Sequence, residues 1–155
     1  MQASNSSLFV ERLIRDAVAE LGRFVGLALE ENGFDGPHTR IALTPEQDAF
    51  LAGYLHGTVV RTVGFGEQIT DEDVERAAAG LHRTLFGSFD IAGRMRHATL
   101  VAEGVDAFRN PQVYLGYCAG HQDSMRRLQD AAHRSSLGKA LADLGRPGQV
   151  AANWN

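Results

Sequence analysis

The chain has 155 residues, of which 44% are hydrophobic and 22% are charged, and this composition is that of one globular domain with a sizeable core. It excludes a membrane-spanning helix, because no stretch approaches the roughly 18 uncharged apolar residues that such a helix needs. The formal net charge of −4 disfavours a nucleic-acid binder, whose affinity depends on concentrated positive charge.

The N-terminal residues and the cysteine usage are those expected of a cytoplasmic protein. The chain does not start with a basic region, and charged residues from Glu11 to Asp16 interrupt any apolar signal core. The single cysteine, Cys118, cannot form an internal disulfide, which agrees with a reducing compartment. Fourteen arginines against one lysine, with abundant alanine and glycine, are typical of a GC-rich bacterial genome.

Helical periodicity dominates the first third of the chain. Apolar residues recur at helical spacing from Phe9 to Ala28 and predict a largely buried helix over Leu8 to Glu31. The following connection, from Gly33 to Leu43, contains turn residues and then a short extended piece over residues 39–43.

The segment from Thr44 to Gly66 is the most apolar and the best delimited, and we expect it to be the central helix of the fold. Thr44 is a strong N-cap, Pro45 suits the first helical position, and Gln47 closes a capping box. Gly64 and Gly66 mark the end of this helix.

Two further helices are predicted after it. Thr70 and Asp73 form a second capping box, which begins a helix that ends at Phe86 and Gly87. Ser88 is the expected cap of the next helix, which has an apolar stripe at helical spacing. The stripe consists of Ile91, Met95, Ala98, Ala102, Val105 and Phe108, and Arg94, Arg96 and His97 would form its solvated edge.

Asn110 and Pro111 begin a fifth helix, predicted to reach about Arg134. One face of it is expected to pack in the core and carries Tyr114, Cys118, His121, Met125, Leu128 and Ala132. Ser135 and Ser136 restart a short sixth helix with Leu137, Leu141 and Leu144 inward. The sequence therefore predicts one all-α domain over residues 1–145, a compact bundle of five main helices plus a short C-terminal helix, with a flexible tail over 146–155. The first, fourth and fifth helices should bury the central one.

Three pairs of glycines, each four residues apart, are the most unusual feature. The pairs are Gly22 with Gly26, Gly53 with Gly57, and Gly116 with Gly120. Each glycine costs about 1 kcal/mol relative to alanine inside a helix, so close backbone packing must compensate. That packing is either a close crossing of helices within one chain or a self-complementary interface between copies.

Histidines supply the candidates for ligand binding. The run from His56 to Val60, followed 26 residues after His56 by Leu81 and His82, resembles the distal and proximal histidine segments of globins. The resemblance implies haem as cofactor, with His56 as the distal histidine and His82 as the axial iron ligand. Tyr114, Cys118 and His121 offer a second ligand-binding face, because an imidazole beside a thiol can lower the pKa of the thiol. No third ligand has recognisable spacing, so no metal site is predicted.

Two segments, Arg127 to His133 and Arg76 to His82, have arginine and histidine separated by five residues. This spacing resembles the active-site motif of HEPN ribonucleases, which are small helical dimers, and the resemblance implies RNA cleavage without a metal.

The leading functional hypothesis is non-catalytic. Glycine-lined faces, together with the lack of a specific catalytic motif, favour a cytoplasmic helical module that self-associates or docks on a protein partner. The alternative is a haem-binding or small-molecule-binding domain that uses His56 with His82, or the face of Cys118 and His121. An enzyme of the ribonuclease kind is the third hypothesis.

Overall fold

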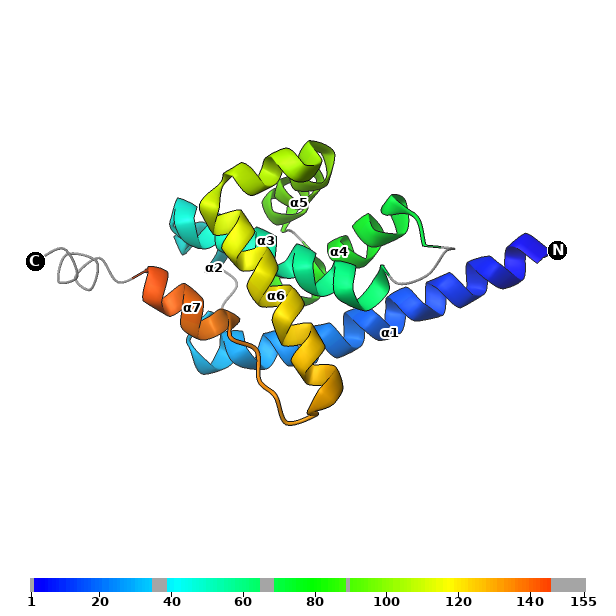
Figure 1. The fold of residues 1–155 in the computed structure, drawn as a ribbon, viewed down its shortest axis with the longest axis horizontal. Coiled ribbons are helices and arrows are strands. Elements are labelled where there is room, and N and C mark those ends of the chain that lie inside the picture. Colours follow the sequence, from blue (N-terminus) through cyan, green and yellow to red (C-terminus); the bar gives the residue numbers. More distant parts are fainter. Residues whose placement is uncertain (1, 35–38, 65–68, 89, 146–155) are drawn as a thin grey trace, which may run out of the picture.

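The computed structural model describes residues 2–34, 39–64, 69–88 and 90–145, and all regular structure in this part of the chain is helical (Figure 1). The all-α prediction is therefore confirmed. The elements in chain order are α1 (Gln2–Glu31), α2 (Thr39–Ala42), α3 (Pro45–Val63), α4 (Asp71–Phe86), α5 (Ile91–Glu103), the 3₁₀ helix η1 (Gly104–Arg109), α6 (Pro111–Gln129) and α7 (Leu137–Leu144).

Helix α3 is the centre of the fold, as expected. Its start is the predicted capping box, in which the Gln47 backbone N–H donates to Thr44 Oγ1 at 3.1 Å and the Thr44 N–H donates to Gln47 Oε1 at 2.8 Å. α6 crosses α3 directly, and α1, α4, α5 and α7 also contact it (Figure 1). Its apolar side chains, such as Leu51 and Leu55, are fully buried and form the middle of the main core.

The glycine pairs of α3 and α6 face each other within one chain. A Cβ atom on Gly53 would lie 2.9 Å from the carbonyl carbon of Val113, and one on Gly116 would lie 3.0 Å from that of Phe50. Gly57 and Gly120 make equally close approaches one turn further along the crossing. The crossing thus buries both pairs in the interior of the chain. Of the two alternatives, the close crossing within one chain holds for these four glycines, which leaves them unable to form the interface between copies.

The remaining pair, Gly22 and Gly26, lies on α1 where α4 packs against it. A Cβ atom on Gly22 would lie 2.9 Å from Thr84 Cγ2, and one on Gly26 would lie 3.6 Å from Leu85 Cδ2. These two glycines therefore also face a neighbouring helix of the same chain.

Several helix ends differ from the predicted ones. α1 begins at Gln2, and its first turns extend beyond the other helices (Figure 1). Residues 39–42 form a helical turn, α2, where an extended piece was expected. Asp90, not Ser88, caps α5, because its carboxylate accepts the backbone N–H of Gly93 at 3.2 Å. α6 ends at Gln129, five residues before the predicted end.

Two predicted core faces lie on the outside. On α5 and η1, Ile91, Met95 and Val105 are exposed, and α5 instead buries Gly93, His97 and Leu100. On α6, the face that begins at Tyr114 is exposed up to Leu128, which keeps 71% of its surface in solvent. The cause on α6 is the close crossing with α3, since a contact at the distance of glycine backbones leaves no room for large side chains.

The C-terminal part follows the prediction. Leu137 and Leu141 of α7 are buried and join the main core, and Leu144 packs partly buried against it. The predicted tail, residues 146–155, lies outside the described residues. Among the described helices, none combines the length and the apolar character that crossing a bilayer requires.

Candidate functional site

Three histidines meet where three helices pack together: His56 is on α3, His82 on α4 and His97 on α5. His56 Nδ1 lies 3.2 Å from His97 Nε2, and the rings of His82 and His97 are 5.6 Å apart at their centroids. His82 is completely buried, with its Nδ1 3.5 Å from Asp90 Oδ2. The expectation that His97 lies on a solvated edge is wrong, because this side chain is buried between α3 and α4.

This histidine cluster does not fit the haem site implied by the globin resemblance. The imidazole of His97 contacts both His56 and His82, so it occupies the space in which a planar haem would have to lie. Burial lowers the pKa of His56 to about 4. Burial and then the neighbouring His82 and His56 lower the pKa of His97 to about 3, so both rings pack uncharged at neutral pH. No group of three potential ligands in the described part of the chain is placed to hold a metal ion.

The second predicted ligand face lies on the outside of α6. Cys118 is exposed, and His121 is half-buried with its ring 6.1 Å from that of Tyr117. An open groove of about 630 Å³ follows this face past Cys118, His121 and Met125. These residues do come together, but on an open helix surface rather than in a buried site.

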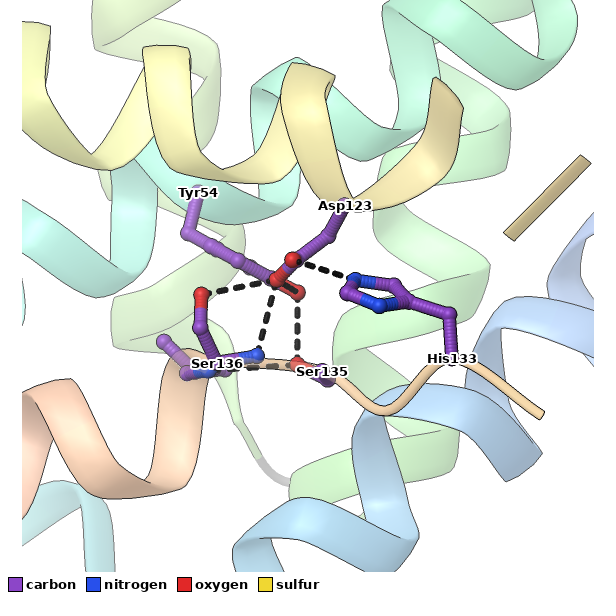
Figure 2. A network of polar contacts seen from close by, with 6 residues as sticks. Tyr54, Asp123, His133, Ser135 and Ser136 are labelled. Carbon is purple, nitrogen blue, oxygen red and sulfur yellow. Dashed lines mark hydrogen bonds and ion pairs between the residues drawn. The ribbon is translucent and has the colours of Figure 1, made fainter. Parts of the chain in front are cut away.

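The best-connected polar site was not predicted, and it centres on Asp123. The carboxylate of Asp123 is buried on α6 and accepts four hydrogen bonds (Figure 2). The donors are Tyr54 Oη at 2.7 Å, the Ser136 N–H and hydroxyl at 2.8 Å each, and His133 Nε2 at 2.9 Å. Asp123 thereby connects α3, α6 and the start of α7.

The hydrogen bonds decide the charges in this network. Burial by itself would raise the pKa of Asp123, but the donors from Ser136, Tyr54 and His133 outweigh it, so the net shift lowers the pKa. Burial and the charge of Asp123 raise the pKa of Tyr54 well above its ordinary value, and Tyr54 keeps its proton. Because Asp123 is ionised, His133 carries a proton on Nε2, and in the neutral imidazole the lone pair is then on Nδ1.

His133 also lines a cavity of about 670 Å³ between α1 and the connection from α6 to α7. Arg127 lies on the same wall, ion-paired with Glu20 and with its guanidinium 5.5 Å from the centre of the Phe24 ring. The predicted pair of Arg127 and His133 is therefore brought to one site. Arg76 and His82 are not, since Arg76 pairs with Glu11 on the surface while His82 is buried.

Comparison of the chain with protein-family models, with curated proteins and with solved structures found no match.

Proposed function

We propose that the chain is a helical module that self-associates through the outer face of α6. The observation that carries this proposal is the outward-facing stripe of Tyr114, Cys118, His121, Met125 and Leu128, all exposed except the half-buried His121, which we name the outer stripe. Its residues follow one another at alternating intervals of four and three, the heptad spacing by which one helix packs against another. Over this length the stripe extends about 21 Å.

The spacing supports a helix as the occupant, and the residues at its edges support a second copy of this chain. Leu115, Gln122 and Gln129 flank the outer stripe and are uncharged, while the exposed Arg126 is the one charged residue in the lining of its groove. The only acid of α6, Asp123, is buried on the opposite side. Two identical faces can meet antiparallel about a two-fold axis, which places the two Arg126 side chains on opposite sides of the centre of the contact, although the chain as a whole is acidic.

Pairing would remove three exposed apolar side chains of α6 from water. Full burial of a side chain such as leucine or methionine contributes roughly 1.5–3 kcal/mol, so a few residues like Leu128, Met125 and Tyr114 support a stable contact. This surface is distinct from the glycine pairs, which are used within the chain.

The test is the mass of the protein in solution, measured by sedimentation velocity and native mass spectrometry. At about 100 µM, well above the dissociation constant of a micromolar dimer, we expect the wild type to be a dimer. The double variant Met125→Glu/Leu128→Glu should be a monomer with unchanged helix content by circular dichroism, because it places charge in the contact.

Val105→Glu is the matched control. Val105 is also apolar and is 82% exposed, but it lies on η1 and outside the outer stripe, so this variant should remain dimeric. A monomeric wild type at this concentration would contradict the proposal. So would a dimer that survives the double substitution or that Val105→Glu dissociates equally well.

A further inference from the structure

We infer that the cavity beside His133 binds a small organic anion with an apolar body, with Arg23 providing the positive charge and His133 a hydrogen-bonding ring nitrogen. We name it the α1 cavity. Binding of a ligand in this cavity is a property separate from self-association, because the residues that line the cavity lie outside the outer stripe.

The charges around the α1 cavity leave one cation uncompensated. Three arginines and two glutamates line it. Arg127 pairs with Glu20, and Arg134 pairs with Glu31 at 2.5 Å. Arg23 is exposed and makes no ion pair with any described residue. The cavity thus carries an excess positive charge in a chain whose net charge is −4, which favours an anion at this place.

The rest of the lining is apolar and has the size of a ligand site. Phe24, Leu27, Ala28, Ala131 and Ala132 contribute to the walls. A volume of about 670 Å³ lies in the range of pockets that hold small molecules. A bare inorganic anion would leave these walls uncovered, whereas a ring or a short hydrocarbon attached to the anionic group would cover them.

His133 is oriented toward such a ligand by the network behind it. Nε2 is engaged by ionised Asp123, and the ring lies 6.3 Å from that of Phe24. Nδ1 has no hydrogen-bond partner among the described residues, and the side chain keeps 21% of its surface exposed. The bond at Nε2 is explained by anchoring of the connection from α6 to α7, but this role leaves Nδ1 available. In the neutral ring Nδ1 can accept a hydrogen bond, and in the protonated ring it can donate one to an anion.

The experiment is an NMR titration of full-length protein labelled with ¹⁵N-histidine, with benzoate as the probe. Acetate carries the same charge without the apolar body, and benzamide carries the ring without the charge. We expect benzoate to shift the His133 ring nitrogens with a millimolar dissociation constant, and to bind at least about fivefold more tightly than either control.

Arg23→Gln should weaken benzoate binding about fivefold, the effect of losing one partly exposed ion pair. Arg15→Gln is the matched control, because Arg15 is an exposed arginine on the same helix that does not line the cavity. Three outcomes would overturn the inference: no response of His133 at about 20 mM benzoate, equal binding of benzamide or acetate, or equal weakening by the two substitutions. A finding that the protein does not dimerise would leave the inference of an anion site unaffected, since the titration is read at His133.

Discussion

A Cβ atom added to Gly53 would lie well inside van der Waals distance of the Val113 carbonyl group and 3.0 Å from the backbone nitrogen of Tyr117. Both obstacles are backbone atoms of α6, so no side chain can rotate away. We expect Gly53→Ala to lower the free energy of unfolding by about 3 kcal/mol or more, because the two central helices must separate. Urea denaturation followed by circular dichroism measures this loss.

Gly26→Ala is the control for Gly53→Ala. Gly26 also lies inside a helix and faces another helix, but its added Cβ would meet only Leu85 Cδ2, at an ordinary 3.6 Å. Gly26→Ala should leave the stability unchanged or raise it by up to about 1 kcal/mol, since alanine favours the helix. Equal losses in the two variants would contradict the close crossing of α3 and α6.

Helix α3 is connected to α7 by one side chain of its own capping box. Besides closing the box with Thr44, Gln47 donates from Nε2 to the Leu141 carbonyl oxygen at 2.7 Å, and this bond is buried. We expect Gln47→Ala to cost about 2 kcal/mol, because it removes part of the cap and the buried bond to Leu141, whose carbonyl oxygen keeps the Gly145 N–H at 3.0 Å.

Asp73→Ala is the control at the equivalent position of the α4 box. Asp73 closes that box with Thr70 and pairs with Arg76, but its hydrogen bonds are exposed, so the expected cost is about 1 kcal/mol. Thermal and urea unfolding of both variants give the comparison. A cost for Asp73→Ala as large as that for Gln47→Ala would mean that the bond to α7 adds nothing.

For the whole molecule, the histidine cluster predicts a loss of stability in mild acid. The pKa values of His56 and His97 are about 4 and about 3 in the folded chain, below the ordinary value near 6.5 that applies when the chain unfolds. Between these values the unfolded state binds more protons, so acid favours unfolding. The free energy of unfolding should therefore fall as the pH drops from about 6.5 toward 4, by up to about 1.4 kcal/mol per pH unit for each group.

Urea denaturation at a series of pH values checks this dependence. His97→Gln should reduce the slope of stability against pH, whatever it does to the stability at pH 7, because one buried proton acceptor is gone. An unchanged slope in His97→Gln would refute the role of the cluster.

Much of the helix layout could be predicted because its signals are local. The capping boxes at Thr44 and Thr70 and the Asn110 cap depend on residues within one turn, and so do the ends at Gly64 and Gly87. Ser88 and Asp90 are both residue types that suit an N-cap, so the prediction of Ser88 differs from the observed cap by two residues, and the sequence does not show which one the chain uses.

The buried faces of α5 and α6 were decided by their neighbours. α6 offers both an apolar face and a small-residue face at helical spacing, and periodicity favours the apolar one. The glycines of α3 allow the two backbones to approach, which buries the small face and leaves Leu128 in solvent. Burial of His97 follows in the same way from the positions of His56 and His82 on other helices.

Sequence alone therefore determined the helical class, most of the helix starts and the need for close packing at the glycine pairs, since these depend on residues near one another in the chain. Only the tertiary structure decided which faces meet and where the polar site forms. Tyr54, Asp123 and His133 are separated by 69 and 10 residues, and nothing in the local pattern of any one predicts the other two. Their arrangement exists because α3, α6 and the start of α7 converge, and convergence is a property of packing rather than of local sequence.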